Sequence, residues 1–229
     1  MGVQDQGGNG SDIPRLTEAD LAELSRLGQQ RTLRRGQSLV LTGDLGGSVL
    51  VVRSGRLKLC HLSAEGKEFI LSLLEPGNLL VTLSDGPAKG PEPLVEALDE
   101  AYLLAVRQQD FEGFLRTRPA AACAVIRQLA ARVRELEERM EEMVFRDIPG
   151  RLATTLLRLA AAYGSREPSG GVAVGLQVTQ QELANLIGSS REMVNHALSH
   201  WKREGVIEVH GRSIVIRRAD ALASLESAR

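Results

Sequence analysis

Near its carboxyl end the chain carries two adjacent helix-start signals, and they constrain the fold more than any other feature of the sequence. Thr179 is followed three residues later by Glu182, a pair typical of a capping box, and Gly188 predicts the end of that helix. Ser189 and Glu192 repeat the pattern at once, which predicts a second helix directly after the glycine. Two helices joined by so short a turn form a helix-turn-helix.

The second helix separates apolar from polar side chains. At roughly 100° per residue, one side collects Met193, Val194, Ala197, Leu198 and Trp201. The opposite arc collects hydrogen-bonding side chains, namely Arg191, Glu192, Asn195, His196 and Ser199. Any amphipathic helix has a solvated polar face, but the preceding turn favours a recognition helix in the major groove of DNA. An arginine can bond guanine there and a carboxylate can accept from cytosine. We therefore expect base contacts from Arg191, Glu192, Asn195 and His196.

A predicted hairpin follows the second helix. Gly205 ends the helix, and two strand-like runs, Val206–Val209 and Ile214–Arg217, flank a polar turn. A hairpin in this place is a wing, with Arg212 at its tip. Phosphate contacts give affinity without sequence information, and we expect them from Ser190, Ser199, Lys202 and Arg212. Arg203 is a further candidate, although each of these residues also fits an ordinary surface position.

The first half of the chain carries a different pattern. A helix is predicted over Leu16–Leu27 with Thr17 as its cap. Short strand-like runs then recur between turn residues, over Ser38–Leu41, Val49–Val52, Leu57–Leu62, Phe69–Leu74, Leu94–Leu98 and Tyr102–Val106. Such spacing favours an antiparallel roll of the jelly-roll type. We therefore expect an α+β protein with a roll domain over residues 15–117, preceded by a disordered leader of residues 1–14.

A long helix is predicted over residues 118–146. Its apolar residues alternate in steps of three and four, at Ile126, Leu129, Val133, Leu136, Met140 and Met143. This is the a/d seam of a coiled coil, and mostly Arg and Glu lie between. The seam could pack on its own domain, but its charged flanks favour a second copy and a two-fold homodimer.

A break at Asp147–Gly150 separates the long helix from a third domain, residues 147–229, which holds the winged helix-turn-helix. A helix is expected there over Arg151–Tyr163, followed by a loop over residues 164–171. Residues 147–229 carry 10 Lys and Arg against 8 Asp and Glu, so this part has a formal charge of +2 and the rest has −3. That asymmetry is small, so a DNA-binding function depends on the local pattern.

Composition excludes several other classes. The two cysteines supply neither a disulfide framework nor a four-thiolate cluster. No stretch reaches the roughly 20 apolar residues of a membrane span, and the first residues lack the pattern of a signal peptide. We expect a cytoplasmic protein that does not bind membranes. His61 is the only histidine before residue 196, so we expect no metal site, no cofactor and no catalytic site, which disfavours an enzyme fused to a DNA-binding tail.

These features, in this order, resemble the CRP/FNR family (cyclic-AMP receptor protein and fumarate–nitrate regulators). The resemblance covers nearly the whole chain. It includes the turns from Arg35 to Asp44, the segment Val52–Lys58, the heptad helix and, most specifically, Thr179–Glu204. It implies a roll like a cyclic-nucleotide-binding domain, a dimerisation helix and a winged helix-turn-helix.

The resemblance also implies roles for individual residues. Arg191 and Glu192 would read a G·C pair in each half-site, and Thr179 and Gln181 would bond phosphate. His196 stands where the family often has a base-contacting arginine, which alters the expected half-site preference. Dimer symmetry implies a near-palindromic site with half-sites about one helical turn (~34 Å) apart, a spacing that comes from the family.

The effector region departs from the family pattern. Cyclic-nucleotide-binding members have Gly-Glu after a Pro-Gly turn and Arg-Ser or Arg-Thr roughly ten residues later. Here Pro76-Gly77 leads to Asn78 through Thr82, no arginine follows before Arg107, and Lys89 is the only basic residue of the 84–93 loop. A buried phosphate without an arginine is poorly compensated. The sequence therefore predicts that cyclic AMP is not the effector.

Other known effectors also fit poorly. An oxygen-sensing iron–sulfur cluster lacks its cysteines. Cys60 and His61 are adjacent strand residues that point to opposite faces and cannot both ligate one haem; a single axial ligand remains open, although a lone strand histidine is usually a surface group. The expected partners are double-stranded DNA, a second copy of the chain and an unidentified small molecule, unless activity is constitutive. RNA polymerase is a further candidate partner. The alternative is a ligand-binding regulatory protein whose helix-turn-helix contacts protein and not DNA.

Overall fold

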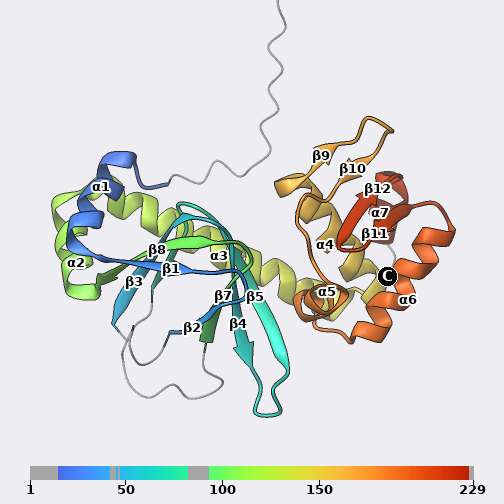
Figure 1. Ribbon diagram of the computed structural model, residues 1–229, viewed down its shortest axis with the longest axis horizontal. Coiled ribbons are helices and arrows are strands. Elements are labelled where there is room, and N and C mark those ends of the chain that lie inside the picture. Colours follow the sequence, from blue (N-terminus) through green and yellow to red (C-terminus); the bar gives the residue numbers. More distant parts are fainter. Residues whose placement is uncertain (1–14, 42–44, 46, 82–92, 227–229) are drawn as a thin grey trace, which may run out of the picture. The chain divides into compact units, whose positions relative to one another are not determined.

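The computed structural model describes residues 15–41, 45, 47–81 and 93–226 (Figure 1). The expected leader over residues 1–14 and Lys89 with most of its loop lie outside the described residues. The chain forms two compact units, one ending at Leu136 and the other beginning at Glu137. No helix among the described residues is long and apolar enough to cross a membrane.

The amino-terminal unit is built on two four-stranded antiparallel sheets. One has the order β1 (Gln29–Leu33), β8 (Ala101–Arg107), β3 (Ser48–Ser54), β6 (Leu79–Val81). The other has the order β2 (Ser38–Val40), β7 (Pro93–Ala97), β4 (Leu57–Leu62), β5 (Glu68–Leu74). The predicted fold class, with its antiparallel roll, long helix and winged helix-turn-helix, is confirmed. The six predicted strands are present within one or two residues at their ends.

Strand β3 shows how the unit is held together. Leu50 and Val52 face a core between the two sheets, while Val49 and Val51 face the other side. Alternate side chains of β3 therefore pack into two different apolar layers, one on each side of the sheet. The second layer is closed by α1 (Glu18–Leu27), α2 (Gln108–Thr117) and the first turns of α3 (Pro119–Phe145).

Three elements of this unit were not predicted: β1, β6 and α2. Strand β1 has four exposed residues and lies at the edge of its sheet, so it lacks the apolar alternation that identifies a strand. Strand β6 has only three residues. Helix α2 contains Gly113, which lowers helix propensity.

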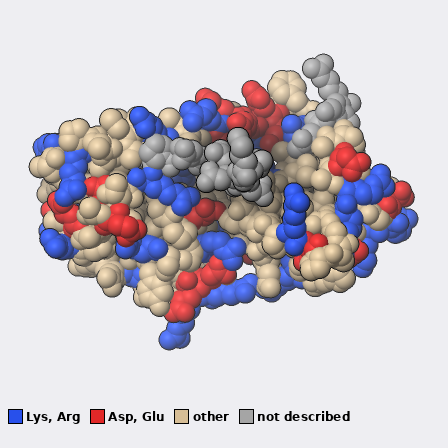
Figure 2. Space-filling view, turned by 90° about the horizontal axis from the view of Figure 1, so that it is seen from above, with Lys and Arg blue, Asp and Glu red and all other residues tan. Residues whose placement is uncertain are grey.

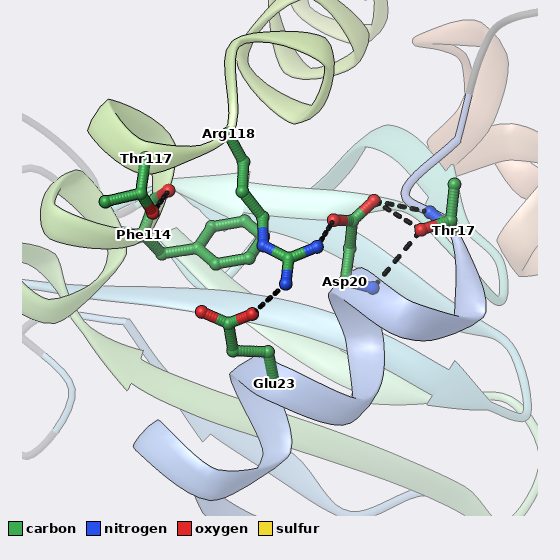
Figure 3. Close-up of polar contacts among 6 residues, drawn as sticks. All are labelled: Thr17, Asp20, Glu23, Phe114, Thr117 and Arg118. Carbon is green, nitrogen blue, oxygen red and sulfur yellow. Dashed lines mark hydrogen bonds and ion pairs between the residues drawn. The ribbon is translucent and has the colours of Figure 1, made fainter.

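Arg118 lies between α2 and α3 and ties α1 to that junction (Figure 3). Its Nη1 lies 3.1 Å from Oδ1 of Asp20, its Nη2 contacts the Glu23 carboxylate, and its guanidinium carbon lies 5.6 Å from the centre of the Phe114 ring. Burial opposes the ionisation of Asp20. Hydrogen bonds from the hydroxyl and amide of Thr17, together with Arg118, outweigh burial and lower the pKa of Asp20 below its usual value.

We expect Arg118→Met to lower the free energy of unfolding by about 1–2 kcal/mol at neutral pH. A hydrogen bond between charged groups contributes about 1.5–3 kcal/mol, and the arginine side chain is 38 % exposed, which screens part of that. Because folding lowers the pKa of Asp20, its contribution is present above the unfolded pKa of about 4 and is lost as pH falls through the folded value.

Urea unfolding of the two proteins measures this difference. It should be largest near neutral pH and should shrink toward about pH 2. Arg116→Met removes an exposed arginine from α2 and is the matched control. A difference of equal size at both pH values would contradict the role assigned to the ion pairs.

Helix α3 spans Pro119–Phe145, so the long helix predicted over residues 118–146 is confirmed. All six predicted seam residues, from Ile126 to Met143, are exposed, with values between 36 % and 67 %. None of them is buried by the protomer's own unit, which disfavours the alternative that the stripe packs on its own domain.

The carboxyl-terminal unit combines helices with a small sheet. Helix α4 (Ile148–Tyr163) begins three residues earlier than predicted, because Asp147 caps it by accepting from the Gly150 amide at 2.8 Å. The sheet has the order β11 (Ile207–His210), β12 (Ser213–Ile216), β10 (Val172–Ala173), β9 (Ser165–Arg166). The segment predicted as a loop over residues 164–171 therefore contains a short strand. Helix α7 (Ala219–Glu226), which was not predicted, packs against α4 (Figure 1).

Candidate nucleic-acid interface

The first helix of the predicted helix-turn-helix is α5 (Gln180–Ile187), and its start is set by a reciprocal cap. The Glu182 amide donates to the Thr179 hydroxyl at 3.1 Å, and the Thr179 amide donates to the Glu182 carboxylate at 2.7 Å. Gly188 ends the helix with φ 64°, a left-handed conformation that favours glycine. The predicted capping box and glycine stop are both confirmed.

The predicted second capping box, of Ser189 with Glu192, is wrong: the cap is the next residue, Ser190, and no reciprocal box forms because the third helical residue is Met193. Helix α6 (Arg191–Arg203) is capped by Ser190, whose hydroxyl accepts from the Met193 amide at 3.3 Å. Ser189 instead lies at the end of α5, where its amide donates to the Ala184 carbonyl at 2.9 Å. Ser189 therefore belongs to the turn, and Arg191 and Glu192 are the first two residues of α6.

The exposed arc of α6 holds the predicted DNA-contacting side chains. Arg191, Glu192, Asn195, His196 and Ser199 are all exposed. Glu192 receives hydrogen bonds from its own amide and from the Ser190 hydroxyl, which, with the nearby charge of Arg191, lower its pKa. At neutral pH it is therefore a carboxylate that can only accept hydrogen bonds.

Met193 does not lie on the buried side, contrary to the prediction. Its side chain is 45 % exposed, whereas Val194, Ala197, Leu198 and Trp201 are buried. Those four residues follow the spacing i, i+3, i+4, i+7, which completes a helical stripe without Met193. This spacing was the signal that could have placed Met193 on the surface. An exposed apolar side chain there could contact a thymine methyl group.

The predicted phosphate-contacting residues differ in solvent exposure and in whether their polar groups already form hydrogen bonds. Ser190, Ser199, Lys202 and Arg212 are exposed, whereas Thr179 is half-buried with its hydroxyl engaged in the capping box. Gln181 is exposed, and its amide donates to Asn185 at 2.8 Å. Gln180, which was not predicted, donates to Asn195 at 3.2 Å and so links the starts of α5 and α6.

Strands β11 and β12 form the wing, joined by Gly211 and Arg212. Gly211 has φ 63°, as a tight hairpin turn requires. Arg217, which was not predicted to have a role, donates to both oxygens of Glu208 at 2.8 and 2.9 Å and also to Ser169 at 3.1 Å. This ion pair lowers the pKa of Glu208 to about 2. Arg217 therefore fastens the wing to the loop before β10.

The positive charge of the buried lysine in the roll, Lys58, is already balanced by two carboxylates and is not available to an anionic ligand. Lys58 is 5 % exposed and forms ion pairs with Glu68 at 2.9 Å and Glu96 at 3.3 Å. Burial, together with Glu68, raises the pKa of the Cys60 thiol, so it stays protonated and is a poor metal ligand. Cys60 is fully buried whereas the adjacent His61 is half-buried.

Charge on the surface is mixed. In Figure 2, acidic and basic side chains are interspersed over the visible face, as expected for a net charge of −1. A long basic surface is therefore not the feature that would attract DNA on this face.

Two protein families match the two parts of the chain. The cyclic nucleotide-binding domain family matches residues 30–118, and the Crp-like helix-turn-helix domain family matches residues 150–225. The Cyclic AMP receptor protein of Thermus thermophilus is 30 % identical over 208 residues, which cover 91 % of this chain and 92 % of that protein. The CRP-like cAMP-activated global transcriptional regulator of Mycobacterium tuberculosis is 29 % identical over 203 residues, covering 89 % and 90 %.

Solved structures agree on the fold. CooA from Carboxydothermus hydrogenoformans, in a mutant form, has a TM-score of 0.77 at 23 % identity, and the match covers 94 % of this chain and 99 % of that one. The c-di-GMP responsive regulator CLP of Xanthomonas campestris has a TM-score of 0.73 at 20 % identity, covering 87 % and 99 %. CLP is named for c-di-GMP, whereas the two relatives above are named for cyclic AMP. The shared fold therefore does not identify the effector.

Proposed function

Because the chain belongs to the CRP/FNR family of transcription regulators, we propose that it is a homodimer that binds a near-palindromic DNA site through α6. The observation that carries this proposal is the pair Arg191 and Glu192. Both are exposed and open the first turn of α6, and Glu192 is ionised. An arginine and a carboxylate side by side there suit the guanine and the cytosine amino group of one G·C pair.

The dimer is proposed through α3. Its seam exposes six apolar side chains, a pattern that a single helix in water would not be expected to retain. A second copy of α3 would cover them in a coiled coil and would present two copies of α6 related by a two-fold axis. Phosphate contacts from Ser190, Ser199, Lys202 and Arg212, with Thr179 and Gln181, would then fix each unit on its half-site.

The proposed effector is a small molecule other than cyclic AMP, although two relatives are named for that nucleotide. No arginine occurs between Arg56 and Arg107, which is the stretch that contains β4 to β8. The buried cation Lys58 is already paired with Glu68 and Glu96. A cyclic phosphate placed in this roll would lack the guanidinium partner that offsets the free-energy cost of its burial.

Fluorescence anisotropy of a labelled duplex with a two-fold TGTGA-type site, across a salt series and with or without cyclic AMP, tests the proposal. We expect salt-dependent binding that is tighter than binding to a scrambled duplex and that cyclic AMP does not change. Binding only with cyclic AMP would overturn the effector proposal. Should neither duplex show salt-dependent binding, and should a random DNA pool also yield no site, the helix-turn-helix would contact protein instead.

A further inference from the structure

The last turns of α3, together with Arg146 directly after the helix, carry three polar side chains that contact the other helices of the carboxyl-terminal unit. Arg139 is 8 % exposed, and its Nη2 donates to the Leu186 carbonyl of α5 at 2.6 Å. Glu142 pairs with Arg158 of α4 at 3.3 Å, and Arg146 donates to the hydroxyl of Thr154, also on α4. Arg139 is the deepest of the three and the one that contacts the helix-turn-helix itself.

These contacts lie beside the apolar seam on the same helix turns. Arg139 and Glu142 follow the spacing i, i+3 on one face of α3, and Arg146 follows the helix directly, with its amide bonded to the Glu142 carbonyl at 3.0 Å. Met140 and Met143 belong to the exposed seam and point roughly a quarter-turn away. One rigid segment therefore holds the polar contacts to α4 and α5 and part of the surface proposed to meet the partner helix.

The Leu186 carbonyl is a favourable target for a buried cation. It lies in the last turn of α5, where carbonyl groups lack partners within the helix and the helix dipole favours positive charge. A guanidinium donating at 2.6 Å makes a short, charge-assisted hydrogen bond there. Only the Gly188 turn separates this point from α6, so Arg139 holds the start of α6 relative to α3.

We propose that Arg139 is a positioning residue that fixes the orientation of the helix-turn-helix on α3, and so sets the half-site spacing that the dimer accepts. This inference rests on the proposed function, since it presumes a dimer on a two-fold site. Arg139 lies outside the exposed arc of α6 and acts through the backbone of α5. Its loss should widen the range of accepted spacings more than it weakens contact with a single half-site.

The test is a spacing profile. Anisotropy is measured for the native protein and for Arg139→Met on duplexes whose two half-sites are moved apart or together in single base-pair steps, and on a duplex with one half-site. For Arg139→Met we expect roughly tenfold or greater loss on the best-spaced duplex, as loss of a charged hydrogen bond implies. Affinity for one half-site and the dimer mass should stay unchanged. The matched control is Arg134→Met, which removes an exposed arginine from the same helix.

Several outcomes decide the proposal. A native profile for Arg139→Met overturns it, and so does equal loss on every duplex. Should the methionine variant fail to fold, Arg139→Gln decides by the same comparison, because its amide is polar but too short to reach the carbonyl. Failure of both variants to fold would assign Arg139 a purely structural role and would also overturn the proposal. Absence of DNA binding by the native protein would instead refute the proposed function.

Discussion

Replacing Arg191 by alanine is expected to weaken binding to the two-fold duplex by at least about 30-fold. A bidentate arginine–guanine contact contributes about 1–3 kcal/mol of discrimination. A dimer loses two of them, which amounts to roughly 2–6 kcal/mol. Arg191 is exposed and opens α6, where alanine is well tolerated, so thermal stability should not change. Anisotropy on specific and scrambled duplexes measures the loss.

The scrambled duplex separates base reading from simple charge attraction. Binding to it should fall only slightly in Arg191→Ala, because one phosphate-attracting charge per protomer is lost. The control is Arg116→Ala, which removes one arginine charge from α2. It should not change the ratio of the affinity for the specific duplex to the affinity for the scrambled duplex. Equal weakening on both duplexes would show that Arg191 contacts phosphate and not a base.

The second large effect is expected at the seam of α3, where Val133→Glu should convert the dimer into a monomer. Val133 is 53 % exposed in the protomer, so the substitution should leave the protomer fold intact. In a two-fold coiled coil it would bury two unpaired carboxylates against each other. Such charges weaken an interface by roughly 3–5 kcal/mol, or about 10²- to 4 × 10³-fold in the dimer dissociation constant.

Sedimentation equilibrium measures this change, and circular dichroism checks that the helices remain. Arg134→Glu puts a carboxylate at the next position, on the charged outer side of the helix, and should stay dimeric. A dimer that survived Val133→Glu but was lost in Arg134→Glu would place the interface on a different face of α3.

Local signals predicted the helix-turn-helix because they act within a few residues. Thr179 and Glu182 bond each other, and Gly188 turns the chain by its own conformational freedom. The heptad helix was equally readable, because its pattern extends over six apolar residues with a single period. Neither feature depends on the rest of the fold.

The prediction failed where a neighbour decides the outcome. Strand β1 consists mostly of polar, exposed residues and is held by its pairing with β8. Ser189 and Ser190 are chemically identical as caps, and the choice between them depends on where the turn after α5 ends and α6 begins. Met193 was predicted to be buried, but it lies next to the buried stripe that begins at Val194 and is not needed to complete it.

Arg139 shows the same limit at a candidate positioning site. In the sequence it is one of several arginines between seam residues and cannot be told from the exposed Arg134. It bonds a backbone carbonyl 47 residues away, and because every residue has such a carbonyl, the amino-acid sequence does not show which one is bonded. Contacts from a side chain to a distant backbone atom emerge only when the tertiary structure is assembled.

The dimer proposed through the exposed seam of α3 would also make DNA binding depend on the concentration of the chain itself. Two half-sites are filled together only by paired chains, so below the dimer dissociation constant the amount of competent protein grows with the square of the chain concentration. A twofold rise in synthesis would then give about a fourfold rise in dimer, whereas far above that constant the response becomes proportional. The affinity of the proposed α3 contact would therefore set how steeply occupancy of the DNA site follows the amount of protein.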